Sequence, residues 1–97
     1  MSDYLPQIAN INVLSGSGSG LINQGGLVFA IGVIPPNGAQ YDISGFDSDG
    51  FLLYFGDDVT GRINLAIRAL IYGPHTIQIS EASVDGVYKV KLWYENW

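Results

Sequence analysis

HTIQISEASVDGVYKVKLWYE, residues 75–95, decides the fold class of this chain of 97 residues. Its two segments, 75–80 and 87–95, place an apolar side chain at every second position, which is the period of a β-strand with one buried face. Between them, Asp85-Gly86 suits the positive φ angles of a hairpin turn. The stretch therefore predicts two β-strands joined by a turn.

Similar short apolar segments, bounded by Gly, Pro, Asn or Asp, continue back to the N-terminus and are typical of an all-β domain. Residues 63–72, INLAIRALIY, fit a strand and also a helix capped by Thr60, and the β surroundings favour the strand. We therefore expect an all-β fold, an antiparallel β-sandwich of about seven strands. The expected strands are residues 7–14, 27–34, 40–44, 51–55, 63–72, 75–80 and 87–95.

Residues 70–80, LIYGPHTIQIS, followed by 84–95, VDGVYKVKLWYE, resemble the late strands of immunoglobulin-like and fibronectin-type β-sandwich modules. The resemblance covers roughly residues 65–95, and it implies a β-sandwich fold. The Cys…Trp…Cys pattern of true immunoglobulin domains is absent, because the chain has no cysteine. Modules of this kind occur in phage virions, bacterial surface proteins and secreted carbohydrate-active enzymes.

Residues 14–26, LSGSGSGLINQGG, look like a linker inside what is otherwise a single domain over residues 1–97. Segments of mostly Ser and Gly pack poorly and span a wide range of distances. We expect an N-terminal β-arm at 1–14, a flexible connector at 15–26 and the sandwich body at 27–97. The arm would pair with its own sandwich edge or be exchanged with a neighbouring copy.

The charge composition argues against two classes of partner. The net charge is −5 with four basic residues, too few for the phosphate contacts of a nucleic-acid binder. The longest apolar run, 27–34, is too short for a membrane helix, so no membrane partner is expected. The start, MSDYLPQIAN, lacks the basic and apolar regions of a secretory leader, and none is expected.

The charges are also unevenly spread along the chain. Residues 1–61 carry six acidic and no basic side chains, whereas residues 62–97 carry four basic and three acidic ones. Two interpretations stay open: chance in a small set, or complementary charge between neighbouring copies.

Catalytic patterns are weak in this sequence. The only histidine, His75, follows a Gly-Pro turn, and no GxSxG nucleophile elbow is present. We interpret His75 as a strand-end residue that is hydrogen-bonded locally. No enzymatic activity and no cofactor are expected.

The acidic segments FDSDGF and GDD offer Asp47, Asp49, Asp57 and Asp58 as weak metal candidates. Closely spaced carboxylates are the ligands that Ca²⁺ prefers. If 51–55 is a strand, the two pairs of acids lie about 17 Å or more apart. A single Ca²⁺ site from all four is therefore not expected, and two solvated turns are favoured.

The last strand carries the main candidate site. Tyr88, Val90, Leu92 and Tyr94 share the face assigned to the core. Lys89, Lys91, Trp93 and, if the strand continues, Trp97 share the other face. Exposed tryptophans mark interfaces or ligand platforms, so these four residues are candidates for an interface or ligand site. The alternative is that a loop or the N-terminal arm covers Trp93. Strands 27–34 and 51–55 are apolar on both faces, so another element or subunit must cover them.

These features together predict a non-enzymatic structural or assembly module that acts through protein–protein contacts, as a homo-oligomer or in a larger assembly. In style it resembles small accessory components of phage virions, such as capsid-decoration, collar or tail proteins. That likeness implies assembly in the host cytoplasm and a place in the virion. The alternative is a carbohydrate-binding or adhesion module, extracellular or at a cell surface, whose aromatic residues stack on a glycan.

Overall fold

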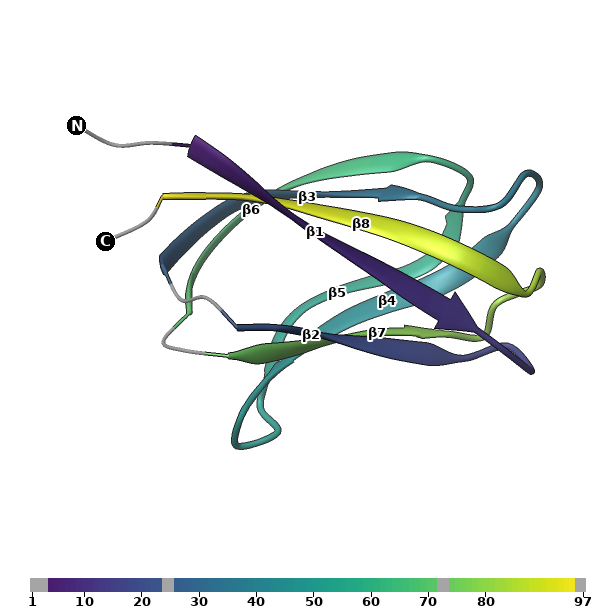
Figure 1. Cartoon of the computed structure of the whole chain (residues 1–97), viewed down its shortest axis with the longest axis horizontal. Helices are drawn as coiled ribbons and strands as arrows, with labels where there is room; N and C mark the ends of the chain where they lie inside the picture. The colour runs from purple at the N-terminus through teal and green to yellow at the C-terminus, as the bar shows by residue number, and fades with distance from the viewer. Residues whose placement is uncertain (1–3, 24–25, 72–73, 96–97) are drawn as a thin grey trace.

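The computed structural model is a sandwich of two four-stranded antiparallel sheets (Figure 1). It describes residues 4–23, 26–71 and 74–95. The strands are β1 (Tyr4–Val13), β2 (Gly18–Ile22), β3 (Gly26–Ile34), β4 (Gln40–Asp47), β5 (Leu52–Thr60), β6 (Ile63–Ile71), β7 (His75–Ser80) and β8 (Gly86–Glu95). The all-β antiparallel sandwich expected from the sequence is confirmed, with eight strands where about seven were expected. The described residues include no helix that is long and apolar enough to cross a membrane.

The chain is arranged as one long antiparallel hairpin that has been rolled up. Going outward from the β4–β5 turn, β4 pairs with β5, β3 with β6, β2 with β7 and β1 with β8. Rolling adds the β3–β8 and β4–β7 pairs, which gives the sheet orders β1-β8-β3-β6 and β2-β7-β4-β5. Every connection except β4–β5 therefore passes from one sheet to the other.

This strand order defines a jelly roll, an eight-stranded double sheet made of Greek keys. Immunoglobulin domains place strands A, B, E and D in one sheet and C, F and G in the other. The resemblance noted in the sequence therefore holds for the β-sandwich and not for the order of its strands. The strand alternative for residues 63–72 is confirmed by β6, although Tyr72 lies outside the described residues.

The prediction of a flexible connector at 15–26 is wrong for most of the residues that the structure describes there. Leu14 and Ser17 exchange backbone hydrogen bonds around Ser15 and Gly16, whose φ angles of 55° and 84° make a type I′ turn. Gly18–Ile22 then form β2, which pairs with β7. Residues 24 and 25 lie outside the described residues.

Glycine in β2 permits close packing between the two sheets. A Cβ at Gly18 would lie 2.3 Å from the carbonyl oxygen of Asn12, and one at Gly20 would lie 3.1 Å from the Ile11 side chain. The alternating Gly-Ser pattern therefore reflects a strand with one face pressed against β1. Small residues were interpreted as flexible because sequence alone does not show what they approach.

The prediction of a hairpin between residues 80 and 87 is also wrong. β7 and β8 lie in different sheets, and the segment between them crosses the sandwich. The Asp85 carboxylate accepts hydrogen bonds of 3.0 Å from the backbone N–H groups of Ser15 and Gly16. Asp85 therefore joins two connections at one end of the sandwich instead of closing a local hairpin.

The core lies between the sheets and is built from the inward side chains predicted by strand alternation. Tyr41 of β4 and Tyr88 of β8 meet edge to face, with ring centroids 5.2 Å apart, and so couple one sheet to the other. Their hydroxyls donate to Gly61 O at 2.8 Å and Val84 O at 2.6 Å. Fully buried apolar side chains include Ile11, Val13, Ile31, Val33, Ile43, Ile77, Ile79 and Val90.

Gly18→Ala should lower the free energy of unfolding by about 1–3 kcal/mol or more, since its Cβ would collide with backbone that cannot rotate away. Chemical denaturation measures the change. Ser19→Ala is the matched control in the same strand, because Ser19 is exposed and its substitution should change stability by about 0.5 kcal/mol or less. Equal effects of the two substitutions would show that β2 does not press against β1.

Candidate functional site

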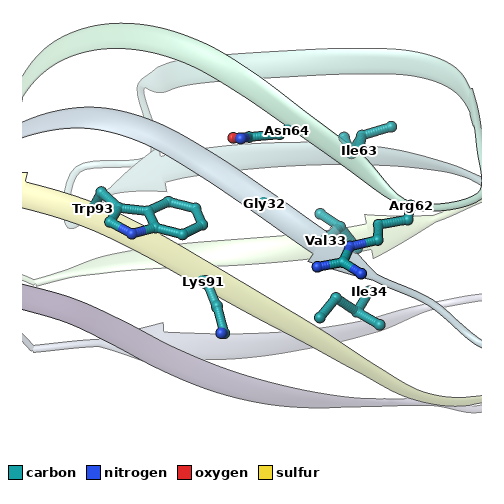
Figure 2. Close-up of a pocket in the computed structure, with 8 residues that line it drawn as sticks. All are labelled: Gly32, Val33, Ile34, Arg62, Ile63, Asn64, Lys91 and Trp93. Atoms are coloured by element: carbon teal, nitrogen blue, oxygen red, sulfur yellow. The ribbon is translucent and has the colours of Figure 1, made fainter.

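A shallow hollow of about 230 Å³ lies on the outer face of the first sheet (Figure 2). Its principal lining residues are Gly32, Ile34, Arg62, Asn64, Lys91 and Trp93. They come from β3, β8, the start of β6 and the bend before it. This combination of an indole, two cations and an amide makes the hollow the candidate functional site.

Trp93 reaches the hollow through the alternation of β8. Val90 and Leu92 are buried in the core, so Lys91 and Trp93 face outward as the sequence predicted. The indole lies against β3 where Gly32 has no side chain, and a Cβ there would lie 3.1 Å from Cζ3 of Trp93. The glycine thus leaves space for the indole ring, and Trp93 is half-buried against its own sheet.

The hollow is electropositive. In Figure 2 the Lys91 ammonium and the Arg62 guanidinium are both drawn at the hollow that Trp93 lines. Neither cation forms an ion pair with a carboxylate among the described residues. Two cations beside an aromatic ring, neither of them paired within the described part of the chain, favour an anionic or carbonyl-rich occupant.

The structure places the remaining predicted site residues differently. Lys89 is exposed on the same strand face but does not line the hollow, and Trp97 lies outside the described residues. The role of Trp93, Lys91, Lys89 and Trp97 as interface or ligand residues stays a prediction.

Arg62 and Asn64 were missed by the sequence analysis. They reach the hollow because β6 pairs with β3, with Asn64 opposite Gly32. This pairing joins segments some thirty residues apart in the chain. The sequence carried one usable signal, because Asn64 occupies a polar position between Ile63 and Leu65 and so belongs on the outer face.

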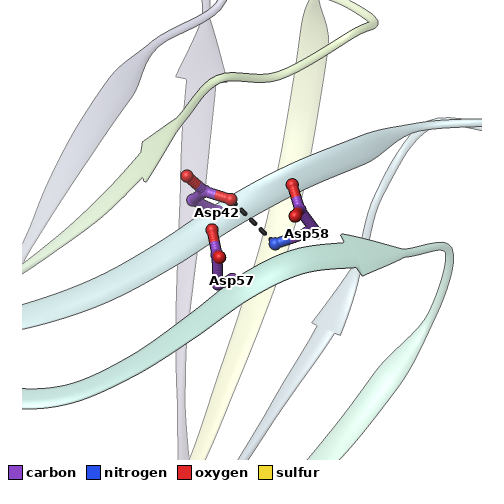
Figure 3. A group of neighbouring side chains, drawn as sticks. All are labelled: Asp42, Asp57 and Asp58. Carbon is purple, nitrogen blue, oxygen red and sulfur yellow. Dashed lines mark hydrogen bonds between the residues drawn. The ribbon is translucent and has the colours of Figure 1, made fainter.

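Three carboxylates meet on the second sheet, where Asp42, Asp57 and Asp58 lie within 4.8 Å of one another (Figure 3). A β-bulge brings them together, since Tyr41 pairs with Val59 and Ile43 with Gly56. Asp42 therefore faces both aspartates of β5, and its Oδ1 accepts the Asp58 N–H at 2.9 Å.

The cluster raises the pKa of the Asp57 carboxyl. The main cause is a hydrogen bond shared with the Asp42 carboxyl, followed by repulsion from the charges of Asp58 and Asp42. Among the described residues, these three aspartates are the group that could hold a cation. Ca²⁺ takes six to eight oxygen ligands, which is more than three carboxylates supply when each gives one oxygen. The expectation that the protein needs no metal stays a prediction.

Asp47 and Asp49 belong to a separate site, the turn between β4 and β5. Asp47 lies five residues from Asp42 along β4, about 17 Å in an extended strand. Its Oδ1 accepts the backbone N–H groups of Asp49 and Phe51, each at 2.9 Å. The structure therefore separates the two acidic pairs and gives Asp47 the role of holding a turn.

His75 lies at the start of β7 with 1% of its surface exposed. Its Nε2 is hydrogen-bonded to the Tyr54 hydroxyl at 3.0 Å, and burial lowers the pKa of the imidazole. The predicted strand-end position of His75 is confirmed, but the prediction of a local hydrogen bond is wrong, because Tyr54 lies 21 residues away in β5.

Comparison with known proteins adds no relative, because no protein family matches this sequence and no curated protein is significantly similar to it.

Asp57→Asn should raise the melting temperature at pH 7, because a raised pKa means that the Asp57 charge disfavours the folded state. Because a group with a raised folded pKa loses stability as the pH rises through that pKa, the gain from Asp57→Asn should shrink as the pH is lowered to the ordinary aspartate pKa of about 3.9 and below. Thermal melts across this range measure it. Asp49→Asn changes net charge equally but lies outside the cluster, and an equal gain there would contradict the prediction.

His75→Phe should remove an acid-dependent loss of stability. Because the folded pKa is lowered, the unfolded state binds the proton more readily, and wild type should lose up to about 1.4 kcal/mol per pH unit below about pH 6.5. Denaturation at pH 7, 6 and 5 tests this. Tyr54→Phe keeps the imidazole and should keep the slope; equal slopes in wild type and His75→Phe would refute the assignment.

Proposed function

We propose that this protein is a non-enzymatic assembly module that acts through contacts between its faces and those of neighbouring proteins, copies of itself included. The observation that carries the proposal is the Trp93 hollow, where an indole lies on the outer face beside Arg62 and Lys91. Tryptophan and arginine are the residues most enriched at interface centres, and charged groups left unpaired on a monomer are available to a partner.

The distribution of charge supports self-association. Five aspartates belong to the second sheet or to the turn at its edge: Asp42 and Asp47 in β4, Asp57 and Asp58 in β5, and Asp49 in the turn between them. Arg62 and Lys91 line the hollow on the first sheet, and Lys89 is exposed on its β8. Complementary charge on two different surfaces of one molecule favours head-to-tail contacts between copies.

The virion role rests on likeness of architecture. Jelly rolls build viral capsid domains, and they also occur in lectins and cupins. A fold hosts many functions, so the strand order alone does not select one. A small capsid-decoration, collar or tail component, placed in the virion after assembly in the host cytoplasm, is the form of assembly module we propose.

The surroundings of the single histidine support a role without catalysis. His75 is buried and hydrogen-bonded to Tyr54, so its ring is not offered to a substrate. A general base must reach the proton that it removes within hydrogen-bond distance. The carboxylates gathered around Asp57 have no such partner imidazole beside them in the described part of the chain.

The second candidate is a carbohydrate-binding module, and the same hollow favours it. An indole can stack on a sugar ring, and the Asn64 amide beside it can hydrogen-bond to hydroxyls. A carbohydrate-binding module should bind a glycan on a glycan array. Titration with that glycan should then change the fluorescence of Trp93 while the protein stays monomeric. An oligomer whose fluorescence is insensitive to glycans supports the assembly module instead.

Trp93→Ala should dissociate the assembly, weakening self-association by about 30-fold or more, as expected when a central anchor residue is removed. Size-exclusion chromatography with light scattering measures the mass over a range of concentrations. Leu14→Ala is the control, because Leu14 is 73% exposed in the turn after β1, away from the hollow. A wild-type protein that stays monomeric at about millimolar concentration contradicts self-assembly.

A further inference from the structure

The turn between β4 and β5 is a rigid, projecting element with an unusual surface. Asp47 and Phe51 form a backbone hydrogen bond of 2.9 Å, and Gly50 N–H donates to Asp47 O at 3.0 Å. Gly50 adopts a φ of 84°, as in a three-residue hairpin loop with a bulge. The Asp47 carboxylate closes the loop from inside with two further hydrogen bonds.

This preorganised turn presents an acid and an aromatic ring to solvent. Phe51 is 69% exposed and the neighbouring Leu52 57%, while Asp49 is exposed beside them. In Figure 1 the turn projects beyond the body of the sandwich, at the lower edge of the view. Two adjacent large apolar side chains, Phe51 and Leu52, are thus left in solvent at this turn, where they are available to a partner.

The Trp93 hollow has the complementary features. Its volume of about 230 Å³ exceeds the cavity of about 150 Å³ that holds a benzene ring, so a phenyl ring fits beside the indole. Arg62 and Lys91 supply the positive charge that an aspartate two residues from that ring would meet. A second copy of this chain therefore carries a turn whose negative charge complements the two cations of the hollow and whose phenyl ring can pack beside the indole.

We propose that the β4–β5 turn of one copy inserts into the Trp93 hollow of the next, with Phe51 against the indole and Asp49 between Arg62 and Lys91. The contact joins two different surfaces, so it is heterologous and propagates into a ring or an open filament. The turn is already ordered by Asp47, so little conformational entropy is lost on docking. This inference identifies the two surfaces that meet in the proposed assembly, and it rests on the proposed assembly function.

Mixing two variants that each lack one half of the contact tests the inference. The turn variant carries Asp49→Ser and Phe51→Ser and leaves Asp47 in place. The hollow variant carries Arg62→Glu and Lys91→Glu. Each variant alone should be a monomer at concentrations where wild type associates, with affinity lowered about 30-fold or more. Their equimolar mixture should form a 1:1 complex and nothing larger, since only one competent turn and one competent hollow remain.

The outcomes separate this inference from the proposed function. Circular dichroism and melting temperature first establish that both variants keep the wild-type fold, as expected because Asp49, Phe51 and Arg62 are exposed and Lys91 is only half-buried. If wild type and the turn variant associate equally, the turn is not the occupant, and the assembly function stands without it. If the mixture yields no complex although each variant is monomeric, the head-to-tail contact is refuted. A monomeric wild type overturns both proposals.

Discussion

The structure depends on the antiparallel pairing of the two halves of the chain about the β4–β5 turn. The ladder between β1 and β8 runs from Tyr4–Glu95 to Val13–Gly86, so the first strand is held by the last. Each pair nearer the turn repeats this relation, and rolling the ladder buries one face of every strand. Most contacts are therefore formed between segments distant in sequence, and such topologies fold slowly because loop closure precedes the gain from pairing.

The same rolling explains where the candidate surfaces lie. All connections except β4–β5 cross between the sheets, so β4 and β5 are the only consecutive strands among those described that pair within one sheet, and their turn is free to project. The hollow arises on the opposite sheet, where β3 lies between β8 and β6 and Gly32 leaves room for Trp93. One glycine position thus decides that the indole lies in a recess of its own sheet and does not project freely.

Alternation made much of the fold predictable. The inward faces of β1, β7 and β8 follow from side chains such as Ile11, Ile77 and Val90, and the outward positions of Lys91 and Trp93 follow from the same period. The Ser-Gly stretch before Ile22 was misjudged because small residues indicate flexibility or close approach equally well. Asp42 and Arg62 were missed because their neighbours are set by a bulge and by strand pairing, neither of which local sequence records.

The amino-acid sequence by itself determined the all-β class, the faces of most strands and the separation of acidic from basic residues along the chain. These properties follow from periodicity and composition, which are local. Only the tertiary structure decided the jelly-roll order, the glycine contacts between β1 and β2, and the meeting of Arg62, Asn64, Lys91 and Trp93 in one hollow. The physical reason is that backbone hydrogen bonding is the same for any pair of strands, so which strands pair is settled by the packing of the whole sandwich.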